Sequence, residues 1–146
     1  SWDILWLVAG GIGLGYGLDQ SGLAEHLVRS IPFEGMSIFA VVGGSAFLAM
    51  IMANFMSNTA TANLLLPIIA ALAVALPGIS QIGGSSTIIL AVALSASLGM
   101  ALPISTPPNA LAHATGEVQT GQMAKMGTLV GIIGIGLIFL TLWIIA

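Results

Sequence analysis

Charged side chains are scarce in this sequence of 146 residues, of which two are basic and five are acidic. Apolar residues make up 58% of the chain, and a soluble domain of this size could not keep its surface hydrated with so few charges. The composition therefore predicts an all-α integral membrane protein. Because Arg29 and Lys125 are the only basic residues, it also excludes nucleic acid as a partner.

Cysteine is absent, which excludes a disulfide framework and thiolate chemistry. The sequence also lacks H-E-x-x-H and G-x-S-x-G motifs, and no apolar segment carries a pair of aspartates. We therefore do not expect an intramembrane hydrolase or any other enzyme. The first residues, Ser1, Trp2 and Asp3, include neither an initiator methionine nor a charged signal region. We expect a fragment of a longer polypeptide.

The first 34 residues combine an apolar helix with a short amphipathic segment. Residues 2–18 form an apolar run that would reach about 25 Å as a helix, which is a short membrane span. Four glycines between positions 11 and 17 would let another helix approach closely, and their spacing does not fit a dinucleotide-binding fingerprint. Residues 20–30 combine charged positions with one apolar helical face, which favours a helix lying at the membrane interface.

Two further apolar segments, residues 37–53 and 61–76, are short for full spans and are joined by a polar but uncharged stretch. Six amide or hydroxyl side chains fall within ten residues there: Asn54, Ser57, Asn58, Thr59, Thr61 and Asn63. A loop in water would normally carry charges, so we predict a re-entrant helical hairpin over residues 37–76 with its tip inside the protein at membrane depth. Hydrogen bonding between packed helices is the alternative role, and it is the one we favour for Thr61 and Asn63.

A discontinuous membrane helix is predicted over residues 87–115. The prolines at 103, 107 and 108 cannot continue a helix, because each lacks an N–H group and clashes with the preceding turn. We expect a first half that ends at Pro103, a break around Ser105 and Thr106, and a second half that starts at Asn109. His113, one turn later, is interpreted as a packing residue.

The last predicted transmembrane helix covers residues 122–146 and follows a polar connector that contains Glu117. Gly127 and Gly131 lie one turn apart in it and form a ridge on which another segment can pack closely.

Two clusters of Ser, Thr and Asn, one at the hairpin tip and one at the helix break, are typical of the binding sites of secondary transporters. In such sites, broken helices turn free N–H groups and carbonyls toward substrate and ions. Carbonyl and hydroxyl oxygens suit Na⁺, and free N–H groups at a helix start suit an anion.

These motifs resemble the divalent anion/sodium symporter family (DASS, INDY-type dicarboxylate transporters). The resemblance rests on Ser57-Asn58-Thr59, preceded by Asn54-Phe55-Met56, and on Ser105-Thr106-Pro107-Pro108-Asn109-Ala110 about fifty residues later. It covers nearly the whole chain, which would be the C-terminal part of the family's second inverted repeat. Residues 1–34 would then hold a scaffold helix and an interfacial arm helix. Residues 35–146 would belong to the transport domain, and the first repeat would lie outside this sequence.

The resemblance also implies roles for individual residues. Ser57, Asn58 and Thr59 would contact a substrate carboxylate, and Thr106 and Pro107 would contact substrate from the broken helix. A sodium ion would be bound by three positions: the amide of Asn58 and the backbones of Ala53 and Ser105.

The resemblance therefore predicts sodium-coupled symport of a divalent anion, with a C4-dicarboxylate such as succinate as the leading substrate. It implies an elevator mechanism and a homodimer, embedded in the lipid of a cell membrane, which we expect to be a bacterial inner membrane. Three alternatives remain: another anion or cation antiporter of the same broad superfamily, a channel of that superfamily, and a structural membrane subunit that transports nothing. A channel would need a ring of pore-lining residues, and a structural subunit would leave Ser105, Thr106 and the two prolines after them unexplained.

Overall fold

The computed structural model of the chain describes residues 36–145 without a gap, together with positions 6, 9, 10, 13, 16, 17, 20–23, 26 and 30. The expected scaffold helix at 2–18 therefore falls mostly outside the described residues, and so do positions 24, 25 and 27–29 of the arm expected at 20–30. From residue 36 onward the described chain is helical and contains no strand. Its elements are α3 (Ile38–Phe55), α4 (Asn58–Ala75), the 3-10 turn η2 (Ile79–Ile82), α5 (Ser85–Ala96), α6 (Pro107–Ala114) and α7 (Thr120–Ile145).

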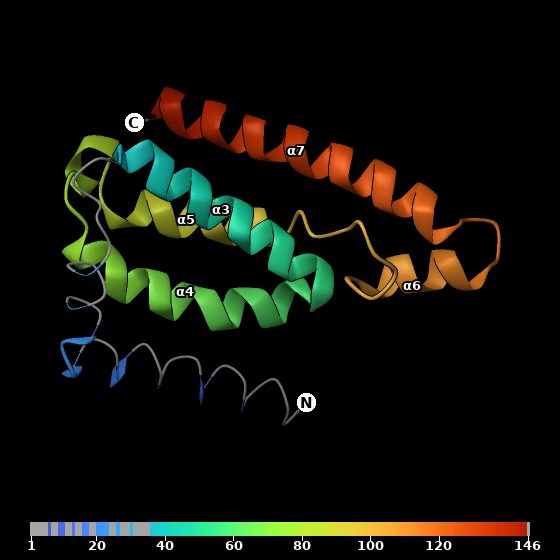
Figure 1. Cartoon of the computed structure of the whole chain (residues 1–146), viewed down its shortest axis with the longest axis horizontal. Coiled ribbons are helices and arrows are strands. Elements are labelled where there is room, and N and C mark those ends of the chain that lie inside the picture. Colours follow the sequence, from blue (N-terminus) through green and yellow to red (C-terminus); the bar gives the residue numbers. More distant parts are fainter. Residues whose placement is uncertain are drawn as a thin grey trace.

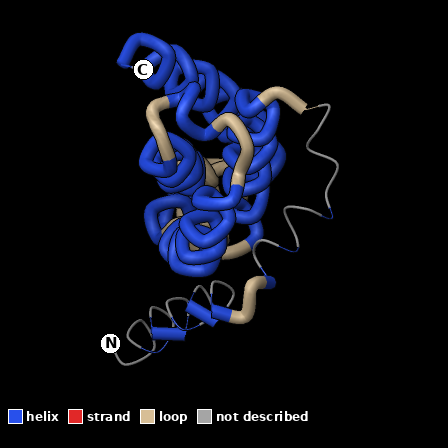
Figure 2. The backbone as a smooth tube through the Cα atoms, turned by 90° about the vertical axis from the view of Figure 1, so that its left-hand side faces the viewer, coloured by secondary structure: helices blue, strands red, loops and turns tan. Residues whose placement is uncertain are grey.

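Three helices pack around a core of alanine and branched aliphatic residues, with α5 in contact with both α3 and α4 (Figure 1). The chain runs in one direction along α3, returns along α4, and runs forward again along α5. Ile88, Ala91 and Val92 on α5 are buried in this core. The view along the bundle in Figure 2 has the helical tubes gathered side by side, with α7 along one flank in contact with α5 and α3.

Helices α3 and α4 form the predicted antiparallel hairpin, but the connection between them is shorter than the sequence suggested. Only Met56 and Ser57 separate the two helices. The Ser57 hydroxyl accepts a hydrogen bond from the backbone N–H of Ala60 at 3.1 Å, and this cap lets α4 begin at once. Most of the polar stretch is therefore helical, and Pro67 is accommodated inside α4.

Three described helices, α3, α4 and α7, are long and apolar enough to cross a membrane. With 18 residues each, α3 and α4 would reach about 27 Å. This length fits either a hairpin that crosses the membrane twice or a tilted hairpin that ends within it. The membrane protein predicted from composition is thus consistent with the fold, and the depth of the hairpin tip remains a prediction.

The discontinuous helix is present, but its first half is shorter than predicted. Helix α5 spans Ser85–Ala96, so it starts two residues before the expected Thr87 and ends seven residues before Pro103. The prediction that it continues to Pro103 was wrong, because tertiary contacts rather than proline end it. Gly99 lies so close to α3 that an added Cβ would stand 2.4 Å from the Cβ of Ala53. The chain then runs without regular helix until α6 begins at Pro107.

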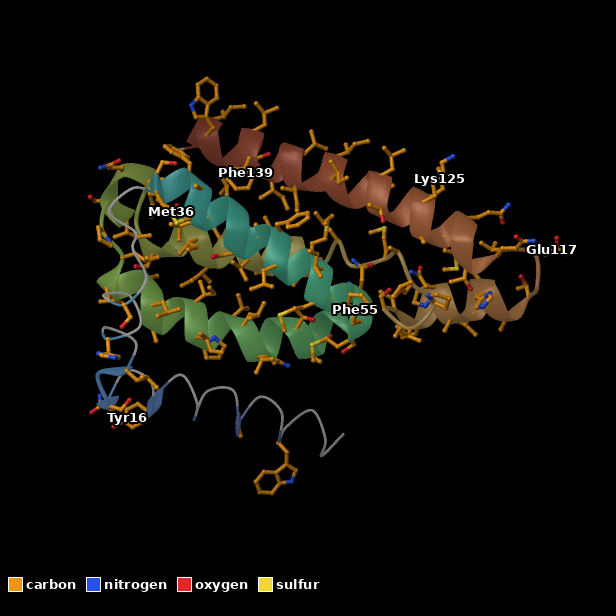
Figure 3. The ribbon with its side chains drawn as sticks, viewed as in Figure 1. Tyr16, Met36, Phe55, Glu117, Lys125 and Phe139 are labelled. Atoms are coloured by element: carbon orange, nitrogen blue, oxygen red, sulfur yellow. The ribbon has the colours of Figure 1, made fainter. Side chains whose placement is uncertain are left out.

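The glycine ridge predicted on α7 is confirmed. A Cβ added at Gly127 would lie 2.5 Å from the Cα of Ala101, and one added at Gly131 would lie 2.6 Å from the sulfur of Met50. Gly134 continues the same face against Leu98. Farther along α7, Phe139 points toward α3 in Figure 3, where its ring approaches Gly43. These glycines therefore allow α7 to pack directly on the non-helical segment after α5.

Candidate functional site

The start of α4, at the hairpin tip, presents hydrogen-bond donors that the helix does not use. The first N–H groups of a helix have no partner within it. Here the cap residue Ser57 binds the N–H groups of Ala60 and Thr61, through its hydroxyl and its carbonyl. The N–H groups of Asn58 and Thr59 are left to face outward. The side chains of Ser57 and Thr59 are exposed beside them. The first two N–H groups of α4 and the hydroxyls of Ser57 and Thr59 thus belong to three consecutive residues at the positive end of the helix dipole, which favours an anion.

Asn58 joins this helix start to the end of α5. Its amide nitrogen donates to the backbone carbonyl of Ser97 at 3.3 Å. Since only the nitrogen of an amide can donate to a carbonyl, this contact fixes the orientation of the side chain. The Asn58 Oδ1 atom therefore points elsewhere, and it is buried without a hydrogen-bond partner.

Asn54, one turn before the tip, holds the non-helical segment from the α3 side. Its Oδ1 accepts a hydrogen bond from the N–H of Ala101 at 2.7 Å, and its Nδ2 donates to the carbonyl of Met50 at 2.8 Å. The sequence placed Asn54 in the polar cluster but gave it no such role. The sequence carried only one signal for this role, an asparagine just before the tip. Its partner, Ala101, is 47 residues away in the chain, so no local pattern could identify it.

Asn109 holds the same segment from the α6 side. Its Nδ2 donates to the carbonyls of Met100 at 2.8 Å and Leu102 at 3.3 Å. The hydroxyl of Ser105, which is buried, donates to the carbonyl of Leu102 and accepts from the N–H of the same residue. Asparagine and serine side chains thus replace the helical hydrogen bonds that the break gives up.

The start of α6 is less suited to an anion than the prolines in the sequence suggested. Thr106 is the N-cap, and its hydroxyl accepts from the N–H of Asn109 at 3.4 Å. Pro107 and Pro108 occupy the first two helical positions, and proline has no N–H to donate. Thr106 is half-buried and Pro107 is exposed. These two residues can contact a ligand by their side chains, whereas free backbone donors come from α4.

The predicted site residues therefore gather at one end of the bundle. The hydrogen bonds of Asn54, Asn58 and Asn109 tie the hairpin tip, the end of α5 and the start of α6 to one non-helical segment. Ala53 is fully buried against Gly99 in that region. In Figure 1 the α3–α4 connection lies at the end of the bundle from which α6 extends.

The site is built from neutral groups. Over residues 36–145 the charged side chains are those of Glu117 and Lys125, and both are exposed. In Figure 3 they lie at the turn before α7 and on its early turns, away from Phe55 at the end of α3. Among the described residues no group of His, Cys, Asp and Glu could hold a metal ion. A cation here would need carbonyl, amide and hydroxyl oxygens.

His113 has a structural position, as the sequence indicated. Its Nδ1 lies 3.1 Å from the carbonyl of Val118 and its Nε2 lies 3.3 Å from the Thr120 hydroxyl. The ring therefore links α6 to the start of α7 and does not face the hairpin tip.

Comparison with known proteins gives consistent matches over almost the entire chain. The family described as "Sodium:sulfate symporter transmembrane region" matches residues 1–145. The sodium-dependent dicarboxylate transporter SdcS of Staphylococcus saprophyticus is 33% identical over 143 residues, which cover 97% of this chain and 27% of that protein. SdcS of Staphylococcus aureus strain MRSA252 is 34% identical over 146 residues, which cover 99% of the chain and 27% of the relative.

An uncharacterized transporter of Haemophilus influenzae is 34% identical over 134 residues, which cover 90% of this chain and 28% of that protein. The chain thus spans about a quarter of the length of the curated relatives it matches. The family resemblance inferred from the Ser-Asn-Thr and Ser-Thr-Pro motifs is confirmed by these matches.

Proposed function

This chain belongs to the sodium:sulfate symporter family of membrane transporters, and we propose that it contributes one half of a site for sodium-coupled transport of a divalent anion. The family is one of multi-pass membrane transporters rather than enzymes. The names of the SdcS relatives support a dicarboxylate as the substrate class and sodium as the coupling ion. Succinate, a C4-dicarboxylate, is our leading candidate.

One observation carries the proposal: donors for an anion and neutral oxygens for a cation meet at the start of α4. The N–H groups of Asn58 and Thr59, with the exposed hydroxyls of Ser57 and Thr59, suit one carboxylate of the substrate. The Oδ1 atom of Asn58 lacks a protein partner and suits Na⁺. A carboxylate and a cation held by neighbouring atoms stabilise one another, which is the physical basis of coupling.

The roles proposed for the other site residues rest on where these residues lie relative to the helix break. Thr106 and Pro107, at the start of α6, would contact the substrate from the other side of the break. The backbones of Ala53 and Ser105 would complete the sodium coordination begun by Asn58. Ser105 is buried within the non-helical segment and Ala53 is buried against it, so both backbones are shielded from water. Carbonyl oxygens in such a setting replace the hydration shell of a monovalent cation.

The whole transporter would work as a homodimer in the bacterial inner membrane, with an elevator movement of the transport domain. In this proposal the α3–α4 hairpin is re-entrant, and residues 36–145 move together against the scaffold. The extensive packing of α5 on α3, α4 and α7 supports a rigid moving unit. The hinge would lie between residues 32 and 35, which are outside the described residues.

Uptake by the full-length protein in proteoliposomes tests the function. We expect an inward Na⁺ gradient to drive accumulation of a dicarboxylate in preference to citrate or sulfate. Thr59→Ala should raise the KM for that substrate, because it removes one hydroxyl from the anion position. Thr141→Val, which removes an exposed hydroxyl that bonds only to Leu137 of its own helix at 2.8 Å, is the control. Accumulation that ignores the Na⁺ gradient, or a panel in which no dianion enters, would refute the proposal.

A further inference from the structure

Helix α6 is held by polar contacts rather than by apolar packing in the part of the chain that the structure describes. None of its eight residues is buried there, and the side chain of Leu111 is 71% exposed. Short helices normally depend on a buried apolar face for their stability and position. The start of α6, at Thr106 and Pro107, is nevertheless the end proposed above to contact the substrate. Side-chain hydrogen bonds therefore decide where this end lies.

Two side chains one turn apart anchor α6. The first is Asn109, whose amide donates to two carbonyls of the non-helical segment at 2.8 and 3.3 Å. The second is His113, which lies four residues later on the same helical face. Asn109 stands between His113 and the substrate end of the helix. A helix held only at Asn109 could swing about that point, whereas a second anchor at His113 fixes its direction.

Both ring nitrogens of His113 take part in the second anchor. The Nδ1 atom lies 3.1 Å from the carbonyl oxygen of Val118. Because a carbonyl can only accept, Nδ1 carries a proton. In the neutral ring Nε2 is then an acceptor, and the Thr120 hydroxyl, 3.3 Å away, donates to it. One imidazole thus connects α6 to two points of the chain that follows it.

The partners of His113 belong to a well-defined frame. In the turn after α6, Gly116 adopts the left-handed conformation with φ of 79°, and the Thr115 hydroxyl accepts from the N–H of Glu117 at 3.2 Å. The first residues of α7 follow and lie beside α6 (Figure 1). Helix α7 in turn packs on the non-helical segment at Gly127. The segment that binds Asn109 and the turn that binds His113 are therefore braced against each other through α7.

We propose that His113 is a positioning residue that sets which length of dianion the transporter prefers. By fixing the direction of α6, it fixes the distance between Thr106 and the anion position at the start of α4. The two carboxylates of a dicarboxylate span a limited range of distances, so this distance selects among substrates. The inference rests on the proposed function and deepens it, because it assigns selectivity to a residue that does not touch the substrate. The buried Ser105 holds the chain next to Thr106, so losing His113 shifts this end without releasing it.

Uptake kinetics of the full-length protein in proteoliposomes test this role, with succinate and the longer glutarate as paired substrates. His113→Ala should raise the KM for succinate by about 2- to 10-fold, which corresponds to the loss of one ordinary hydrogen bond. The kcat should stay nearly unchanged, because the substitution weakens binding of the substrate and not a step that follows it. The preference for succinate over glutarate, as the ratio of kcat/KM values, should fall. The Na⁺ concentration for half-maximal uptake should not move.

Three further variants make the result specific. His113→Asn keeps a donor near the position of Nδ1 and should recover part of the selectivity, whereas Thr120→Val removes the partner of Nε2 and should lose part of it. Gln122→Ala is the matched control, since it breaks a 3.1 Å hydrogen bond to the N–H of Gln119 beside the start of α7. It should leave the selectivity unchanged.

A structural role alone would give a different pattern. If His113→Ala lowers the unfolding temperature but keeps the KM and the substrate preference, or if His113→Asn recovers no selectivity, the positioning role is overturned. If the unmodified protein takes up neither dicarboxylate in Na⁺, the proposed function itself fails, so the two failures are distinguishable.

Discussion

Asn54 is the residue on which the shape of the helix break depends most directly. It is half-buried in the last turn of α3 and satisfies the backbone N–H of Ala101, which would otherwise be buried without a partner. Leaving such a group unpaired costs about 1–3 kcal/mol. Asn54→Ala should therefore lower the stability of the full-length protein by about this amount, as measured by thermal unfolding in detergent.

Asn63→Ala is the matched control for that substitution. Asn63 is also a half-buried asparagine, but it lies on α4, five residues beyond Asn58, and in the part of the chain that the structure describes it holds no backbone group of the break. We expect little change in stability. Equal destabilisation by both substitutions would mean that Asn54 acts through general packing rather than through Ala101.

Asn58 unites the two proposed binding functions in one side chain. Its nitrogen binds Ser97 and its oxygen is available to Na⁺. Asn58→Ala should weaken Na⁺ and substrate binding together, because the ion and the anion stabilise one another. Isothermal titration of the full-length protein with each ligand provides the measurement. A loss of substrate affinity with an unchanged dependence on Na⁺ would contradict the shared role.

Helix α7 depends on glycine where it crosses the non-helical segment. Gly127→Ala would place a Cβ within 2.6 Å of the Met100 carbonyl oxygen and within 2.5 Å of the Ala101 Cα, so α7 and this segment must separate. Overpacking of this kind costs about 1–3 kcal/mol. We expect a lower unfolding temperature and weaker substrate binding, because the displaced segment leads directly to Thr106.

Gly136→Ala provides the comparison on the same helix. Nothing lies within 4 Å of a Cβ added there, and alanine is favoured over glycine in a helix by up to about 1 kcal/mol. Its stability should equal or exceed that of the unmodified protein. If both alanine variants unfold at the same temperature, the close approach of α7 to residues 100 and 101 does not limit stability.

The hairpin makes a separate prediction about membrane topology. Ser37 caps the start of α3, and η2 follows the end of α4 and contacts α3. Cysteines at Ser37 and at the exposed Ser80 should therefore react with an impermeant thiol reagent from the same side of the membrane. A cysteine at Met56 should react only when substrate and Na⁺ are absent, because the tip then opens to the binding cavity. Labelling of Met56→Cys from the opposite side, unaffected by ligands, would identify two full spans and refute the re-entrant hairpin.

Local sequence signals predicted the elements that depend on local chemistry. The Ser-Asn-Thr motif indicated the hairpin tip, and Gly127 and Gly131 indicated a close helix contact, since capping and small side chains act within one or two turns. The end of α5 could not be predicted in this way. It depends on the amides of Asn54 and Asn58, which are about 40 residues away in the chain and take over the hydrogen bonds of residues 97 and 101.

For the molecule as a whole, charge is the governing constraint. Taking a dianion out of water costs several kcal/mol per charge even after relaxation. The positive end of the α4 dipole at Asn58 stabilises a bound anion by only about 0.3–2 kcal/mol. The described part of the chain has no cationic side chain near this helix start. The exposed Lys125 lies on α7 and points away from the bundle in Figure 3. Bound Na⁺ is then the source of positive charge for this half of the site.

Substrate binding with and without Na⁺ is the most direct test of this account. Affinity of the purified full-length protein for a dicarboxylate should be measured in Na⁺ and in choline at the same ionic strength. We expect the affinity to fall by about 5- to 150-fold in choline, the usual range of coupling between two sites, and to recover as Na⁺ is added. The same coupling requires the dicarboxylate to tighten Na⁺ binding by the same factor. Equal affinity for the dicarboxylate in the two salts would contradict the central claim that Na⁺ neutralises the substrate.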